Sequence, residues 1–198
     1  MIKLGITGGI GSGKTIVSDL LSLHGIPVYI ADTESKILTD SSPVIRRKLI
    51  DVFGEKIYNN GLLDRKLLAS YIFSDKEKLQ IVNHIIHPVV YKHFDEWCAI
   101  HSHKKIVALE SAILFESGFD KVVDKSIMVY TPLEMRVKRV MERDNISEEK
   151  VLSRINSQMQ DEEKVKLSDF VIVNDNKESL ILQVREMLQQ LDNMNNNG

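Results

Sequence analysis

The sequence predicts an α/β fold built on a parallel sheet, and two patterns and one junction support this prediction. Short apolar runs alternate along the 198 residues with longer segments that have helical periodicity. The apolar runs are rich in Ile and Val without polar alternation, which is typical of strands covered on both faces. The first run passes through a glycine-rich loop directly into a helix. The expected strands are Ile2–Thr7, Pro27–Ile30, Ile106–Leu109, Ile127–Tyr130 and Phe170–Val173.

Helical periodicity fills most of the remaining chain. The interval between the second and third strands is almost entirely helical and longer than a strand–helix–strand crossover needs. We therefore expect one domain with a core at about 1–32, 88–135 and 168–192, a helical substrate-binding insertion at about 33–87, a mobile, charged helical lid at about 136–167, and a frayed tail at 193–198. The expected helices are Thr15–Leu23, Thr33–Leu38, Pro43–Phe53, Arg65–Phe73, Lys76–Asn83, Pro88–His101, Leu133–Arg143, Glu148–Gln158 and Lys177–Leu191.

Composition limits the partners and the compartment. The formal net charge of −2 argues against a mainly electrostatic attachment to nucleic acid or to an anionic membrane. Cys98 is the only cysteine, so no intramolecular disulfide can form, which fits a reducing cytosol. No apolar run approaches the roughly 20 residues that a membrane-spanning helix needs. We expect a soluble cytoplasmic protein with no nucleic-acid or membrane partner.

The loop after the first strand matches the pattern G-x-x-x-x-G-K-[ST] from Gly8 to Thr15. Its glycines let the backbone curl around an anion and direct successive N–H groups inward. Lys14 supplies a positive charge for the β- and γ-phosphates, Thr15 offers a hydroxyl to Mg²⁺, and the following helix points its N-terminus at the phosphates. A glycine-rich turn with a chance lysine is the weaker alternative, because strand, loop and helix come in the required order. The loop predicts binding of a nucleoside triphosphate.

Acidic residues follow two of the expected strands. Asp32 could accept a hydrogen bond from an acceptor hydroxyl at the ligand crevice of the sheet. The same residue type would also cap a helix that begins at Thr33, and the spacing does not separate the two roles. Glu110 ends an apolar strand in the manner of a Walker-B acid, which holds Mg²⁺ directly or through water, although an acid at a strand end is common. Glu116 is a lesser candidate of the same kind.

Several cations could contact an anionic substrate. Arg136, Arg139 and Arg143 follow the spacing i, i+3, i+7, which places three guanidiniums on one helical stripe. A solvated charged face usually explains such a run, but phosphoryl transfer needs cations around the equatorial oxygens. We favour a functional role for Arg139 and Arg143, and less so for Arg136. Arg65, after a possible helix cap at Asp64, could be merely exposed or could contact an anion.

Two further motifs have weaker readings. His84 and His87 are three residues apart, but no third metal ligand is evident nearby, so we expect His87 to bond a backbone group or touch a substrate phosphate. Asn176-Lys177-Glu178-Ser179 is similar to the Asn-Lys-x-Asp motif of GTPases. Ser179 stands where the guanine-reading carboxylate would be, which weighs against a GTPase.

A series of short motifs follows in a specific order along almost the whole chain. The motifs are Gly8–Lys14, Ala31-Asp32, Leu63-Asp64-Arg65, Phe73-Ser74-Asp75, His87-Pro88, Leu114-Phe115-Glu116, Arg143-Asp144, Arg154 with Gln158, and Asp169–Asn174. Through these motifs the chain resembles the dephospho-coenzyme A kinases over about residues 2–190. It departs from the usual pattern at Ala112-Ile113, where Pro-Leu is usual, at Ile30, where Asp is usual, and at Arg136, where Gln is usual.

The resemblance implies a P-loop kinase three-layer sandwich with a parallel five-stranded sheet, a helical acceptor-binding insertion and a helical lid. It implies ATP-dependent phosphorylation of the ribose 3′-hydroxyl of dephospho-coenzyme A with Mg²⁺, in a monomer or small homo-oligomer. Asp32 would orient or deprotonate the hydroxyl, Lys14 would hold ATP, and Arg139 would stabilise the transferring phosphoryl group. The implied ATP contacts are Gly11, Ser12, Gly13, Lys14, Thr15, Ile16, Arg143 and Asn174; the acceptor contacts are Asp32, Arg65 and His87; the metal contacts are Thr15 and Glu110, the latter directly or through water.

Overall fold

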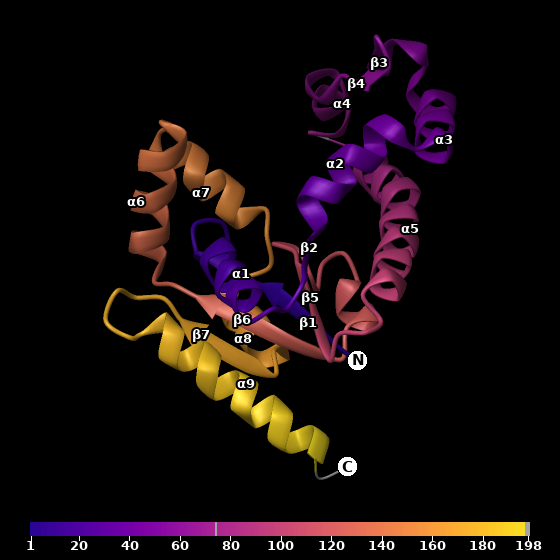
Figure 1. Cartoon of the computed structure of the whole chain (residues 1–198). Helices are drawn as coiled ribbons and strands as arrows, with labels where there is room; N and C mark the ends of the chain where they lie inside the picture. The colour runs from indigo at the N-terminus through magenta and orange to yellow at the C-terminus, as the bar shows by residue number, and fades with distance from the viewer. Residues whose placement is uncertain (74, 197–198) are drawn as a thin grey trace. The chain divides into compact units, whose positions relative to one another are not determined.

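The computed structural model describes residues 1–73 and 75–196 (Figure 1). The chain divides into two compact units. The sheet unit consists of residues 1–29 and the chain from residue 101 onward, and the helical unit consists of residues 30–100. Ser74, which belongs to one of the resemblance motifs, and residues 197–198 of the expected tail lie outside the described residues.

A five-stranded parallel sheet organises the sheet unit, as predicted. Its order is β2-β5-β1-β6-β7, so the strand that leads into the glycine-rich loop is central. Parallel registers align Leu4 with Ala108 in the neighbouring strand and Ile127 with Phe170 in the next pair. Each predicted strand is present with ends shifted by at most two residues. The strands are β1 (Ile2–Thr7), β2 (Val28–Ile30), β5 (Ile106–Glu110), β6 (Lys125–Tyr130) and β7 (Phe170–Val173).

Helices cover both faces of this sheet and complete the three layers (Figure 1). On one face, α1 (Lys14–Leu23) and α9 (Leu180–Asn196) bury Val17, Leu21 and Val184 against Leu4 and Ile6 of β1. On the opposite face, Leu114 packs closely against Gly5 of β1, where an added Cβ would lie 2.9 Å from Leu114 Cδ2. The 3-10 helix η2 (Phe119–Val122) packs beside β1, and α8 (Asp161–Leu167) packs beside β6.

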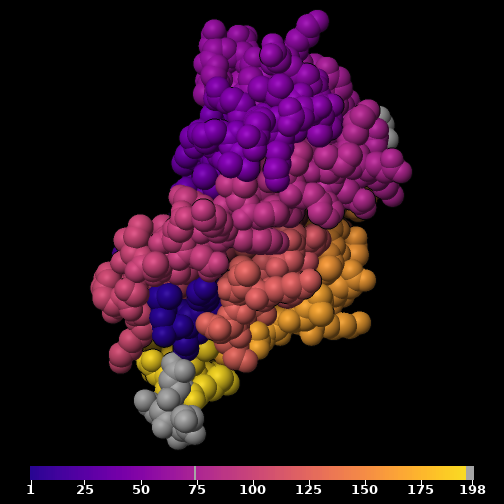
Figure 2. Space-filling model, turned by 90° about the vertical axis from the view of Figure 1, so that its right-hand side faces the viewer, coloured from indigo at the N-terminus to yellow at the C-terminus, as the bar shows by residue number. Residues whose placement is uncertain are grey.

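The C-terminal helix is longer than expected. Residues 193–196 were expected to be frayed, but α9 continues to Asn196. The buried side chain of Leu191 anchors the last turns to the core. The end of this helix lies beside the first residues of β1 at the surface, where Met1, Ile2, Leu191 and Met194 line one groove (Figure 2). Tertiary packing thus extends a helix into a polar sequence with little apolar surface.

The helical unit has its own core. Its main elements are α2 (Ala31–Ser41), α3 (Pro43–Phe53), the 3-10 helix η1 (Glu55–Ile57), α4 (Arg65–Ile72) and α5 (Lys76–Ile100). Residues from each side of the unit, including Ile45, Leu49, Ile57 and Leu68, are buried together. The unit includes all of α5, so it is longer than the expected insertion at 33–87.

Two local expectations in this unit are corrected. The expected helices Lys76–Asn83 and Pro88–His101 form one helix, α5, with Pro88 inside it. A proline removes one helical hydrogen bond, but burial of Ile85 and Val90 on either side keeps the helix continuous. A short hairpin, β3 (Tyr58–Asn59) with β4 (Leu62–Leu63), was not anticipated. Asn60-Gly61 at its turn has φ values of 48° and 84°, so the Asn-Gly signal was present in the sequence.

The segment expected as a lid contains three helices rather than two. They are α6 (Leu133–Asp144), α7 (Glu148–Asn156) and α8. The expected helix Glu148–Gln158 ends two residues early at Asn156, and α8 starts at Asp161 with three acidic residues in its first turn. Negative charge there favours a helix N-terminus, a signal that the sequence already held. No helix in the described part of the chain is long and apolar enough to cross a membrane.

Candidate active site

The glycine-rich loop joins β1 to α1 and has the backbone needed to enclose an anion. Gly11 and Gly13 have φ values of 81° and 90°, which other residues rarely adopt. The Lys14 ammonium lies inside the curl, because its Nζ donates to Gly8 O at 2.9 Å and to Gly9 O at 3.4 Å. The side chain of Thr15 is exposed on the first turn of α1. The loop can therefore present N–H groups, one cation and one hydroxyl to a phosphate chain.

Two residues support this loop, one directly after β7 and one directly after β6. Asn174 is buried, and its Nδ2 donates to Ser12 O at 2.8 Å. The Thr131 hydroxyl donates to the same carbonyl at 2.9 Å. A Cβ on Gly13 would lie 2.2 Å from Asn174 Nδ2, so only glycine fits against this side chain. Asn174, expected as an ATP contact, supports the loop from behind in this arrangement.

Glu110 stands at the base of the loop. It ends β5 beside Ile6 of β1, is almost fully buried, and its Oε2 accepts a hydrogen bond from Ser18 Oγ at 2.6 Å. Ser18 lies one turn beyond Thr15 in α1, so the acid and the two hydroxyls flank the same helix start. Within residues 1–73 and 75–196 no cluster of three or more His, Cys, Asp or Glu could hold a metal by itself.

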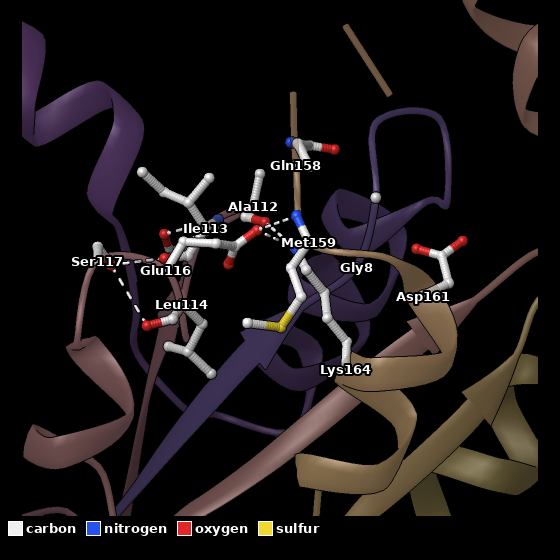
Figure 3. Close-up of polar contacts among 12 residues, drawn as sticks. Gly8, Ala112, Ile113, Leu114, Glu116, Ser117, Gln158, Met159, Asp161 and Lys164 are labelled. Carbon is white, nitrogen blue, oxygen red and sulfur yellow. Dashed lines mark hydrogen bonds and ion pairs between the residues drawn. The ribbon is translucent and has the colours of Figure 1, made fainter. Parts of the chain in front are cut away.

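Glu116, the lesser metal candidate, is engaged elsewhere (Figure 3). Its Oε1 accepts hydrogen bonds from Lys164 Nζ at 2.9 Å and from Met159 N at 2.8 Å. Lys164 is completely buried and also donates to Ala112 O at 2.6 Å. A buried ammonium requires such partners, so this cluster fastens α8 to the segment after β5. The sequence showed the acid but not its partner, which is 48 positions away.

Arg136 leaves the expected arginine stripe and points into the protein. Its side chain is 2% exposed, its Nε donates to Ile10 O at 3.0 Å, and its guanidinium pairs with Asp161. Burial lowers the pKa of Arg136, although an arginine remains charged at neutral pH. A Cβ on Gly9 would lie 2.4 Å from the guanidinium carbon, so the group lies directly against the loop. Arg136, for which a functional role was the weaker expectation, therefore contacts the loop.

Arg139 and Arg143 meet different surroundings. Arg139 is half-buried, and its Nη2 donates to Asn176 Oδ1 at 2.9 Å and lies 3.4 Å from Asn174 Oδ1. Arg143 is exposed and pairs with Asp144 at 2.7 Å. Hydrogen bonds from Arg143 hold the pKa of Asp144 below its usual value. Arg139 is therefore the stripe member that lies beside the residues supporting the loop.

In the helical unit, Arg65 is oriented by an acid. Its Nη2 donates to Asp40 Oδ2 at 2.7 Å and to Lys36 O at 2.9 Å, while 43% of its side chain remains exposed. Burial raises the pKa of Asp40, but the hydrogen bonds from Arg65 and the Leu63 N–H outweigh it and leave that pKa lowered. Asp64 caps α4 by accepting from Leu67 N at 2.9 Å, as one of the two expected readings required.

Asp32 and His87 belong to the same unit. Asp32 is exposed and is the second residue of α2, which begins at Ala31. Ile30 takes the N-cap position, and no side-chain hydrogen bond caps this helix in the described structure, so the N-cap reading of Asp32 is wrong. His87 is half-buried on α5, where burial and the nearby His84 lower its pKa. An exposed carboxylate on a helix first turn is available to a hydroxyl substrate.

Sequence reasoning missed two contacts near the glycine-rich loop. Ser18 of α1 donates to Glu110 at the end of β5, and Gln158 Oε1 accepts from Ile10 N in the loop itself at 3.0 Å. Neither follows a local spacing rule, since Ile10 and Gln158 are 148 positions apart. Gln158 appeared in the sequence only as part of a family pattern.

Comparisons with known proteins agree on one family. The model of the dephospho-CoA kinase family matches residues 2–179. A dephospho-CoA kinase from Bacteroides fragilis is 51% identical over 190 residues, covering 94% of this chain and 91% of the relative. A solved structure of a Thermus thermophilus protein superposes with a TM-score of 0.83 at 34% identity, over 96% of each chain. The structure of dephospho-CoA kinase from Campylobacter jejuni gives 0.70 at 28% identity, over 98% of each chain.

Proposed function

The chain belongs to the dephospho-CoA kinase family, and on this premise we propose how its residues carry out the reaction. The enzyme phosphorylates the ribose 3′-hydroxyl of dephospho-CoA with ATP and yields CoA and ADP, the final step of CoA biosynthesis. Phosphoryl transfer asks a protein mainly for positioning and for charge stabilisation. For each residue we therefore ask which reacting atom it positions or which charge it stabilises.

The phosphate loop holds the donor. The observation that supports this most strongly is the Lys14 ammonium inside a loop whose glycines at 11 and 13 have left-handed backbones. The N–H groups of Gly11 to Ile16 would bind the β- and γ-phosphates, with Lys14 neutralising their charge. Thr15 would ligate Mg²⁺, and Glu110 would hold it directly or through water. When bound, the ion neutralises the charge that develops on the phosphates.

The acceptor is held by groups of the helical unit. Asp32 would accept a hydrogen bond from the 3′-hydroxyl and take its proton as the phosphoryl group arrives. The exposed guanidinium of Arg65, oriented by Asp40, suits an anionic group of the acceptor. The lowered pKa of His87 favours the neutral imidazole, so it would contact the acceptor by hydrogen bonding rather than by charge.

Arginines of α6 would complete the site. Arg139 would place its charge on the transferring phosphoryl group, where an arginine acts in a fixed planar geometry. Arg143, on the next turn of the same helix, would contact ATP, and Asn174 would support the loop that binds it. Exclusion of water by the α6–α8 segment would limit hydrolysis of ATP.

One assay tests the reaction. Purified protein is given Mg·ATP and a panel of hydroxyl compounds, and ADP formation is followed. We expect ADP only with dephospho-CoA, and loss of most of this activity in Lys14→Ala but not in Lys150→Ala, an exposed lysine of α7. ADP formation at the same rate with and without an acceptor, or a normal rate in Lys14→Ala, would refute the assignment. Chelation of Mg²⁺ should abolish turnover and be reversed by adding the ion.

The compartment and the assembly remain predictions. We propose a cytoplasmic enzyme that is a monomer or a small homo-oligomer. Sedimentation velocity over a range of concentrations would determine the assembly.

A further inference from the structure

Ile10, at the tip of the phosphate loop, contacts the α6–α8 segment in three different ways. Its side chain packs against the apolar cluster formed by Val137 and Val140 of α6 and Val151 and Ile155 of α7. Its carbonyl oxygen accepts from Arg136 Nε at 3.0 Å, and its N–H donates to Gln158 Oε1 at 3.0 Å. None of the residue roles proposed above for the reaction depends on these contacts.

The two hydrogen bonds restrain both peptide planes around Ile10. The N–H belongs to the Gly9–Ile10 peptide, and the carbonyl belongs to the Ile10–Gly11 peptide. In a trans peptide the N–H points opposite to the carbonyl, so Arg136 also determines where the N–H of Gly11 points. That N–H is the first of those proposed to bind phosphate. Gly11 itself could turn freely, because glycine tolerates many backbone angles.

Arg136 is itself held in one orientation. Its guanidinium is 2% exposed, pairs with Asp161 of α8, and lies against Gly9, where any side chain would collide with it. Asp161 is only 13% exposed, so the pair is largely shielded from solvent. The Lys164–Glu116 ion pair then fastens α8 to the segment after β5 (Figure 3). Gln158 lies beside this cluster, next to Met159, whose N–H Glu116 also binds.

We propose that Arg136 and Gln158 are positioning residues that hold the phosphate loop in its ATP-binding conformation through the two peptide groups of Ile10. Neither needs to touch the nucleotide. The proposal rests on the loop being the ATP site, as described above. It makes ATP affinity depend on Arg136 and Gln158 even without contact between these two residues and ATP.

Substitutions at Gln158 test this directly. Gln158→Met keeps the length of the side chain but leaves the Ile10 N–H without an acceptor, whereas Gln158→Glu keeps an acceptor in place. Gln158 is only half-buried, so both variants should fold. Leaving a part-buried donor unpaired should weaken Mg·ATP binding about tenfold in Gln158→Met, and much less in Gln158→Glu. Gln160→Met, an exposed neighbour, is the matched control.

The readout separates positioning from general stability. Calorimetric titration with Mg·ATP gives the affinity, and thermal unfolding gives the stability of each variant. We expect KM for ATP to rise with little change in KM for dephospho-CoA, and amide exchange at Ile10 to accelerate. A lower Tm with unchanged ATP affinity in Gln158→Met would overturn the proposal.

A double-mutant cycle gives a second test. Because Arg136 and Gln158 act on the same residue, their effects on ATP binding should not add in Arg136→Met/Gln158→Met. Additive effects would show that they act separately and would contradict the proposal. If Arg136→Met fails to fold, Asp161→Asn replaces it, since Asp161 orients the guanidinium. Wild-type turnover with dephospho-CoA is measured in parallel, so failure of the proposed function is recognised independently.

Discussion

At the scale of single residues, one arginine stripe illustrates how surroundings assign roles. Arg136 is buried against the loop, Arg139 lies beside Asn174 and Asn176, and Arg143 pairs with Asp144 in solvent. The helical spacing correctly placed the three on one helix, within about 60° of one another, because a helix turns by about 100° per residue. Small differences in direction therefore separate a buried side chain from an exposed one.

Arg139→Ala should mainly reduce kcat. An arginine that stabilises the transferring phosphoryl group can contribute roughly 10³–10⁵ in rate, and its charge matters most in the transition state. Steady-state kinetics with varied ATP would measure the split between kcat and KM. Lys138→Ala, an exposed neighbour on α6, should behave as wild type. An effect on the KM for ATP alone would make Arg139 a ground-state contact.

Asp32→Asn should lower kcat with dephospho-CoA by about 10²–10⁴, the usual contribution of a general base. The amide can still accept a hydrogen bond but cannot take the proton. Asp51→Asn, another exposed acid of the helical unit, is the control. Unchanged kcat in Asp32→Asn would reduce this residue to a favourable charge at the N-terminus of α2.

At the scale of elements, the β1–loop–α1 junction was predicted well because its requirements are local. The strand, the glycines and the helix start all follow from neighbouring residues. The contacts of Gly13 with Asn174, and of Gly9 with Arg136, could not be predicted, because β7 and α6 are distant in the chain. The long helix α5 was missed for a similar reason, since tertiary burial outweighed the local effect of Pro88.

Gly13→Ala should abolish ATP binding, with Gly25→Ala as the informative control. Both glycines have positive φ, 90° and 75°, so both substitutions strain the backbone by about 1–2 kcal/mol. Only Gly13 also places its Cβ 2.2 Å from Asn174 Nδ2, whereas no atom lies within 4 Å at Gly25. Titration with Mg·ATP should therefore show normal affinity in Gly25→Ala. Equal losses in both variants would mean that backbone strain, and not the collision, is decisive.

At the scale of the whole molecule, one acid links two strands of the sheet. Asp169, just before β7, accepts from Lys125 Nζ at 2.8 Å and from Ser126 N at 2.8 Å at the start of β6. Burial raises the pKa of Asp169, but these bonds outweigh it and hold that pKa below the usual value. The folded state therefore favours the carboxylate.

At pH values above the ordinary Asp pKa of about 3.9, this contact should stabilise the folded protein. Its contribution should be lost as the pH falls through the lower pKa of the folded state. Asp169→Asn should cost about 1 kcal/mol or less at pH 7, because the ion pair is more than one-third exposed. Thermal unfolding at pH 7 and pH 3 would measure it, with Asp192→Asn on α9 as control. A difference between wild type and Asp169→Asn that grows in acid would contradict the assignment.

The sequence by itself determined the α/β class, the five strands, the phosphate loop and, through the order of its motifs, the family. These depend on local periodicity, on glycine backbones and on residue types at fixed spacing, which neighbouring residues specify. Only the tertiary structure decided which side chains meet across the chain: Glu110 with Ser18, Lys164 with Glu116, and Ile10 with Arg136 and Gln158. Such contacts depend on how distant elements pack, and the pattern of residues along the chain does not specify that packing.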